Sequence, residues 1–137
     1  MRILIDTNVI MDFILKRQPF SDDAKKVIDM SLEDSVQGCI AAHTIPNLYF
    51  ILRKHLTAEQ RRDILLKFCR MFTVVGIDAD KLESALQNVE FSDFEDCLQV
   101  ECAEDFEADF IITRNIKDFQ NSAVAAIEPA EFIEKFT

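Results

Sequence analysis

Glycine and proline are scarce in this chain, which holds 2 glycines and 3 prolines among its 137 residues. Linkers and low-complexity segments are rich in these residues, so their scarcity leaves little material for a second domain or a repeat array. Hydrophobic residues make up 49% of the chain and include 12 phenylalanines, which excludes a disordered protein. We therefore expect residues 1–137 to form a single domain, since one domain usually holds roughly 100 to 200 residues.

Long apolar runs are absent too. The charged residues that interrupt the longest runs are Asp6, Asp12, Arg53 and Lys54. A membrane-spanning helix needs ~18 or more apolar residues without such interruptions. Asp6 also falls where a signal peptide would require its apolar segment. The sequence therefore predicts a protein of the cytoplasm that neither spans a membrane nor is secreted.

The cysteines lack the close Cys-x-x-Cys spacing that is typical of zinc and redox sites. There are four, namely Cys39, Cys69, Cys97 and Cys102. Their neighbours are largely apolar, as is usual for reduced thiols inside a protein. We expect all four to be reduced and buried.

Positive charge is in short supply, because 15 basic residues face 25 acidic ones and give a net charge of −10. This balance argues against binding nucleic acid by bulk attraction. The bases are nevertheless concentrated in residues 53–70, and the eight acids of residues 93–109 have no base among them. Residues 53–70, together with Arg114, are candidates for phosphate contacts, although solvated helix faces or a surface for a protein partner would show the same pattern.

Short apolar segments alternate with helical patterns along the chain. Strands are expected at residues 3–5, 39–45, 73–78, 109–113 and near 123–127. Helices are expected at residues 9–15, 21–32 with Ser21 as N-cap, 46–55, after Thr57, 79–87, from the cap Ser92 to about 107, and from Pro129 onwards. This alternation predicts an α/β fold, a three-layer α/β/α sandwich with a mostly parallel sheet of four or five strands.

Oxygen-bearing side chains follow the ends of the expected strands. Asp6 ends the first strand and Asn115 follows the strand at 109–113. Ligands of parallel sheets bind outside the carboxyl ends of the strands, so these two side chains should share one edge. Asp93 and Asp96 are expected in the first turn of a helix, three residues apart on one face, with Glu95 turned away and Asp118 able to point the same way. Carboxylates gathered in this manner need a cation, and oxygen ligands favour Mg²⁺ or Mn²⁺.

Three motifs resemble the PIN domain, a nuclease fold that includes the VapC-type toxins of bacterial toxin–antitoxin pairs. "LIDTNVIMD" resembles the opening strand of the family, with Asp6 as its first acid, and "DFEDCLQ" resembles the helix start that carries its third acid, Asp96. "ADFIITRNIKDF" resembles the late strand with its Thr-Arg-Asp or Thr-Arg-Asn ending. The resemblance covers nearly the whole chain. It implies a PIN-like sandwich and a metal-dependent endoribonuclease.

Two positions depart from the family pattern. The second and fourth acids of the family fall at Asn47 and Asn115, which keep an oxygen but lose the charge. We expect one metal ion, either Mg²⁺ or Mn²⁺, held by Asp6 and Asp96 with support from Asp93 and Asp118. The expected catalytic set is Asp6, Asp96, Asp93, Asn115 and Asp118, with Thr113 and Asn8 beside it to orient water or a phosphate oxygen. The resemblance also implies an RNA substrate, a cognate antitoxin and a homodimer.

Other interpretations of these residues remain open. Asp6 would also serve as a helix cap, Asp93 as first-turn charge and Asp118 as a solvated turn residue. A dehalogenase-like phosphatase also places an aspartate after its first strand, but its motif requires a second aspartate where this chain has Asn8. The stronger alternative is a PIN-fold module that has lost cleavage and binds nucleic acid or protein, as Asn47 and Asn115 would permit.

Overall fold

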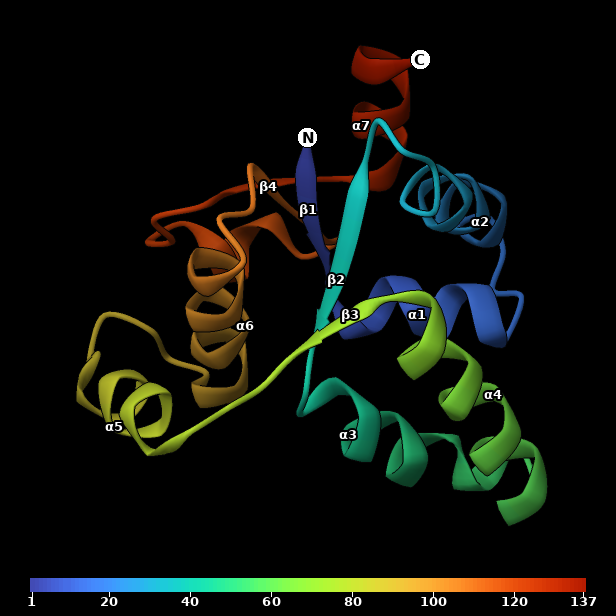
Figure 1. The fold of residues 1–137 in the computed structure, drawn as a ribbon, viewed down its shortest axis with the longest axis horizontal. Helices are drawn as coiled ribbons and strands as arrows, with labels where there is room; N and C mark the ends of the chain where they lie inside the picture. The colour runs from blue at the N-terminus through green and yellow to red at the C-terminus, as the bar shows by residue number, and fades with distance from the viewer.

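Five parallel strands form the sheet at the centre of the molecule (Figure 1). The computed structural model describes all residues, 1–137. The strand order is β3-β2-β1-β4-β5. The strands are β1 (Arg2–Ile5), β2 (Gln37–Ala41), β3 (Thr73–Val75), β4 (Phe110–Ile112) and β5 (Ala125–Ile127). This is the α/β fold with a parallel sheet that the sequence predicts. The sheet has five strands, where four or five were expected.

β1 lies in the middle of the sheet and pairs on both sides. Ile3 is opposite Gly38 of β2 and opposite Phe110 of β4. Ile3, Leu4 and Ile5 are fully buried, because helices cover both faces of a parallel sheet. The carboxyl ends of β1, β2 and β4 therefore open onto the same edge of the sheet.

Seven α-helices and two short 3₁₀ helices surround the sheet. They are α1 (Thr7–Ile14), α2 (Ser21–Met30), α3 (Thr44–Ile51), η1 (Leu52–Lys54), α4 (Ala58–Met71), α5 (Ala79–Gln87), α6 (Phe94–Asp105), η2 (Ile116–Phe119) and α7 (Pro129–Phe136). In Figure 1, α5 and α6 lie on one side of the sheet and α1, α2, α3, α4 and α7 on the other. None of the helices is long and apolar enough to cross a membrane.

Two hydrophobic clusters hold the three layers together, one on each face of the sheet. The larger joins Ile3 and Ile5 to apolar side chains of α1, α2, α3, α4 and α7. The smaller joins Leu4 and Ile111 to Val100 and other residues of α6. Successive residues of β1 therefore alternate between the two cores, as the side chains of a strand must.

The starts of two helices differ from the prediction. Ser21 is the first helical residue of α2 rather than its N-cap, which is Phe20; the buried hydroxyl of Ser21 accepts a hydrogen bond from Gln18 Nε2 at 3.0 Å. α6 is capped by Asp93, not Ser92: Asp93 Oδ1 accepts the backbone N–H of Asp96 at 2.9 Å. The predicted cap Thr57 is confirmed, since it forms a capping box with Gln60.

Other corrections concern strand lengths and burial. β2 ends at Ala41 and α3 already begins at Thr44, so residues 42–45 are not strand as predicted. β3 is likewise shorter than the predicted range and ends at Val75. Cys69 is exposed on α4, whereas the other three cysteines are buried as expected. An apolar stripe predicts which side of a helix faces the core but not where its edge falls, and Cys69 lies just outside that edge.

Candidate functional site

Asp6 joins the ends of the two central strands. Its backbone N–H donates to Ile112 O of β4 at 3.0 Å. Its carboxylate caps α1 by accepting the N–H of Thr7 at 2.8 Å, and it also accepts the hydroxyl of Thr113 at 2.8 Å and the amide of Asn8 at 3.1 Å. Only 6% of Asp6 is exposed. The helix-cap interpretation is therefore correct, and the same carboxylate also lines a pocket.

The pocket at this edge of the sheet has a volume of about 180 Å³. It is lined by residues of α1, α3 and α6 and by residues of the segments that follow β1, β2 and β4: Asp6, Thr7, Asn8, Met11, His43, Asn47, Ile51, Glu95, Asp96, Gln99 and Asn115. Asp6 and Asp96 are 90 positions apart in the chain but share this pocket. The fold thus brings together Asp6, Asp96 and Asn115 of the predicted set, and Asn47 with them.

Negative charge in this pocket is not neutralised by any basic side chain. Burial raises the pKa of Asp6, and the carboxylates of Asp118 and Asp93 raise it further, against the hydrogen bonds from Thr113 and Thr7. Burial also raises the pKa of Asp96 from 3.8 to about 7, helped by Asp93, Asp6 and Asp118. Neither Asp6 nor Asp96 takes part in an ion pair. Such a site favours a cation.

Asp93 and Asp118 lie beside the pocket rather than in its wall. Asp93 caps α6 through the backbone of Asp96, a role that was predicted for Ser92. Asp118, on η2, lines an adjoining pocket that also includes Asn115. Both carboxylates are nonetheless close enough to raise the pKa of Asp6 and Asp96. Glu95, which we expected to turn away, lines the pocket itself.

The donor set fits a hard divalent cation held loosely. The structure contains no preformed group of three or more acidic, histidine or cysteine side chains that could hold a metal ion. The pocket instead offers the carboxylates of Asp6 and Asp96 with the amide oxygens of Asn47 and Asn115 nearby. Mg²⁺ is commonly bound by one or two carboxylates and keeps several of its waters, so these residues suit it.

Gln99 is a pocket residue that the sequence analysis did not identify. It is 2% exposed, and its Nε2 donates to the hydroxyls of Thr7 at 3.2 Å and Thr44 at 3.1 Å. Its Oε1 has no hydrogen-bond partner. Gln99 therefore ties α6 to the starts of α1 and α3 and fixes the helix that carries Asp96. The signal was its spacing, because residues 96 and 99 share a helix face.

His43 also lines the pocket. Its Nε2 lies 3.1 Å from the backbone oxygen of Glu95, so this nitrogen carries the proton and donates. Burial lowers the pKa of His43, which keeps the ring neutral near pH 7. Its Nδ1 is buried without a partner. His43 therefore contributes no positive charge to the site.

Arg114, a candidate for phosphate contacts, is engaged within the protein. Its Nε and Nη2 donate to the two carboxylate oxygens of Asp12 at 2.5 and 3.1 Å, and its guanidinium lies 4.0 Å from the centre of the Phe20 ring. The side chain of Asp12 is 1% exposed. This pair connects α1 to the loop that holds Asn115.

Comparison with known proteins agrees with this architecture. A family model described as PIN domain matches residues 2–117. No curated protein matches the chain. Among solved structures, a toxin–antitoxin complex from Klebsiella pneumoniae is similar, with 23% identity, a TM-score of 0.70, and 92% of this chain and 96% of the other covered.

Two further structures are similar over almost their whole length. One is VapBC-1 from nontypeable Haemophilus influenzae, with 17% identity, a TM-score of 0.71, and 95% of this chain and 99% of the other covered. The second is VapBC2 from Rickettsia felis bound to a promoter DNA fragment, with 19% identity, a TM-score of 0.69, and 93% and 98% covered. At these identities the likeness shows a shared fold.

Proposed function

Because the chain belongs to the PIN domain family, we propose that it is a metal-dependent endoribonuclease that hydrolyses RNA phosphodiester bonds. One observation carries this proposal: Asp6 and Asp96, from distant parts of the chain, line one pocket without a basic partner. Residues 1–137 make up one such domain. The cofactor is Mg²⁺ or Mn²⁺, since the available ligands are oxygen atoms.

Asp6 and Asp96 hold the cation, and the amide oxygen of Asn115 completes the pocket wall beside them. Asp93 and Asp118 add negative charge from outside the wall and favour binding of the cation, directly or through water. When bound there, the cation would lower the pKa of a water molecule and stabilise charge on the phosphate. Thr113 holds the Asp6 carboxylate in place through its 2.8 Å hydrogen bond. Hydrolysis by water leaves a 5′-phosphate and a 3′-hydroxyl.

Cleavage of labelled RNA by the purified protein tests this function. We expect cleavage in Mg²⁺ or Mn²⁺, none in chelator, and none with Asp96→Asn. Asp22→Asn on α2 removes one exposed acid outside the pocket and should cleave like the wild type. Activity that survives Asp96→Asn would refute the assignment of the site.

A second candidate function is a binding module that has lost cleavage. The neutral residues Asn47 and Asn115 and the lack of a cluster of three acids favour it. Calorimetry with Mn²⁺ separates the two, because a competent nuclease should bind the ion and lose that binding in Asp6→Ala. A protein that binds RNA but no Mn²⁺ would be the binding module.

The toxin–antitoxin complexes among the similar structures support a protein partner. We propose that this chain is the toxin of such a pair, acts in the cytoplasm as a homodimer, and is restrained by a cognate antitoxin. Sedimentation of the purified chain would test the dimer. Co-purification with the product of a neighbouring gene would test the antitoxin, and a chain that is harmless when expressed alone would contradict the role of a toxin.

A further inference from the structure

The basic side chains between α3 and the end of α4 have no acidic partners. We name residues 49–70 the basic arm; its six bases are Arg53, Lys54, Arg61, Arg62, Lys67 and Arg70. The six ion pairs of the protein use other bases, namely Arg2, Arg17, Lys25, Lys81, Arg114 and Lys135. In a protein with a net charge of −10, unpaired positive charge is thus concentrated on η1 and α4.

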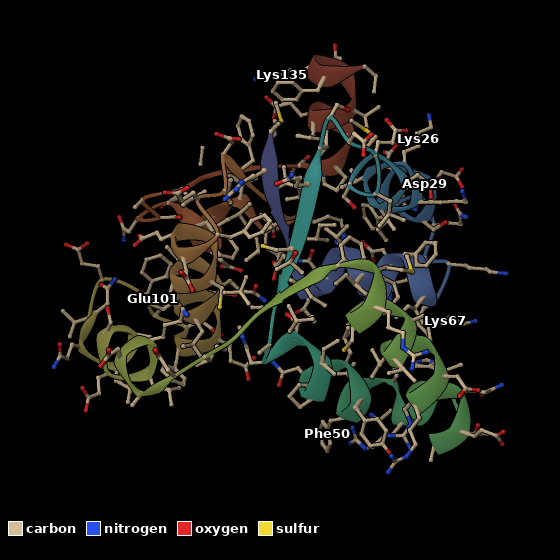
Figure 2. The ribbon with its side chains drawn as sticks, in the orientation of Figure 1. Lys26, Asp29, Phe50, Lys67, Glu101 and Lys135 are labelled. Atoms are coloured by element: carbon tan, nitrogen blue, oxygen red, sulfur yellow. The ribbon has the colours of Figure 1, made fainter.

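Aromatic rings hold several of these guanidinium groups in place. Arg53 stacks on Phe50 at 3.7 Å from the ring centre and donates to Phe50 O at 2.8 Å. Arg61 stacks on Tyr49 at 4.2 Å and donates to Tyr49 O at 2.7 Å. Phe50 is 61% exposed, so its ring remains available to a further partner. Figure 2 shows Phe50 at the outer end of α3, among nitrogen-bearing side chains.

The basic arm is continuous with the candidate site. Asn47 and Ile51 of α3 line the pocket, and Phe50 comes three residues after Asn47, so these two side chains are neighbours on the helix surface. A polymer that leaves the pocket over Asn47 therefore meets Phe50 and then Arg53, which stacks on Phe50. Ile51 is itself 38% exposed, which leaves this route open.

We propose that the basic arm binds single-stranded RNA that extends from the pocket, which rests on the proposed nuclease function. Phe50 stacks on an unpaired base, and Arg53, Lys54 and Arg62 contact phosphates. Stacking on an exposed ring requires a base that is not already paired, so a single strand fits and a duplex does not. The preformed stacking of Arg53 on Phe50 combines a cation with an aromatic platform, as single-strand binding sites do.

The test compares two triple variants with the same change in charge. The arm variant is Arg53→Gln, Lys54→Gln, Arg62→Gln, and the control is Lys16→Gln, Lys26→Gln, Lys135→Gln. Lys26 and Lys135 lie on α2 and α7, far from Phe50 in Figure 2. Binding of a fluorescein-labelled single-stranded RNA of mixed sequence is measured by anisotropy in Ca²⁺ at several salt concentrations.

We expect the arm variant to lose about two units of the slope of log affinity against log salt, since each single-strand phosphate contact contributes roughly 0.7. The control should keep the wild-type slope. Phe50→Ala should weaken single-strand binding roughly ten-fold and leave binding to duplex RNA unchanged. Equal losses in the two triple variants would overturn the proposal, because they would show attraction by bulk charge. Failure of the wild type to bind single-stranded RNA would overturn it too.

Cleavage assays separate this proposal from the nuclease assignment. If the wild type cleaves RNA and the arm variant cleaves equally well at low RNA concentration, the basic arm is not the RNA surface, although the nuclease stands. If RNA binding depends on the basic arm but no metal supports cleavage, the surface stands and the nuclease falls.

Discussion

Asp96 carries a charge that the metal-free fold does not balance. Because its pKa is raised from 3.8 to about 7, the folded state prefers the protonated form. Its contribution to the free energy of unfolding is therefore most favourable below pH 3.8, declines as the pH rises, and is least favourable above about pH 7. An uncharged residue of the same shape removes this penalty.

Asp96→Asn should accordingly stabilise the metal-free protein at pH 8 while it abolishes cleavage. Asp96 is partly exposed, so the penalty is discounted for screening to about 1 kcal/mol, which raises the Tm by roughly 2–6 °C. Thermal unfolding in chelator measures the change, and the gain should vanish at pH 3.5 or below. A lower Tm at pH 8 would contradict the origin of the pKa shift. Asp63→Asn, on α4, serves as the control.

Asp12 is the opposite case, a buried carboxylate that is fully paired. Arg114 binds both of its oxygens, and Arg17 Nη1 lies 3.8 Å from Oδ1. Asp12→Ala leaves Arg114 without its partner and should lower the free energy of unfolding by about 2–4 kcal/mol, as loss of one member of a buried pair does. Urea denaturation measures the free energy of unfolding. As a control, Asp22→Ala replaces an exposed acid of α2 and should change this free energy by less than about 0.5 kcal/mol.

Two glycines make a matched test at the scale of the elements. A Cβ at Gly38 of β2 would lie 2.6 Å from Ser31 Cβ and 3.1 Å from the Phe72 ring, whereas a Cβ at Gly76 would meet nothing within 4 Å. Gly38→Ala should therefore push β2 away from α2 and α4 and cost about 1–3 kcal/mol of stability. Gly76→Ala should be neutral. Chemical denaturation measures the free energy of unfolding of both variants. If Gly38→Ala is as stable as Gly76→Ala, β2 can shift without cost.

Asp93, the N-cap of α6, has two roles that substitutions can separate: it caps the helix, and it adds negative charge beside the pocket. Asp93→Ser keeps a cap for α6 but removes the charge, so we expect unchanged stability and a roughly two- to five-fold weaker affinity for Mn²⁺ by calorimetry. Asp93→Ala removes both and should also lower stability by about 1 kcal/mol. If Asp93→Ser binds Mn²⁺ as tightly as the wild type, Asp93 acts only as a cap.

The order and type of the elements could be predicted from the sequence, because apolar periodicity and strong caps such as Thr57 act locally. The start of α6 could not, since Ser92 and Asp93 are both good caps and only the three-dimensional chain path selects one. The same limit applied to the site. Asp6 and Asp96 follow from local motifs, and the three-residue spacing from Asp96 marks Gln99 as a residue of the same helix face. His43 lies beside α6 through its contact with the backbone of Glu95, which no local pattern reveals.

At the scale of the whole molecule, divalent metal ions and protons should compete for the same carboxylates. This competition should be visible in the Tm. A ligand that binds only the folded state raises the Tm, and a divalent ion needs Asp6 and Asp96 in their charged forms. Millimolar Mn²⁺ should therefore raise the Tm at pH 8 by several degrees and have little effect at pH 5. Asp6→Ala should show no metal effect at either pH. An equal shift in Asp6→Ala would place the ion elsewhere.

The central position of β1 also determines when the candidate site can form during synthesis. β1 leaves the ribosome before β4, yet Asp6 is held by Ile112 and Thr113, and Thr113 is made 107 residues after Asp6. Until β4 is made, β1 is paired on one side only, with β2. The proposed nuclease site therefore cannot form on the nascent chain before β4 has been synthesised.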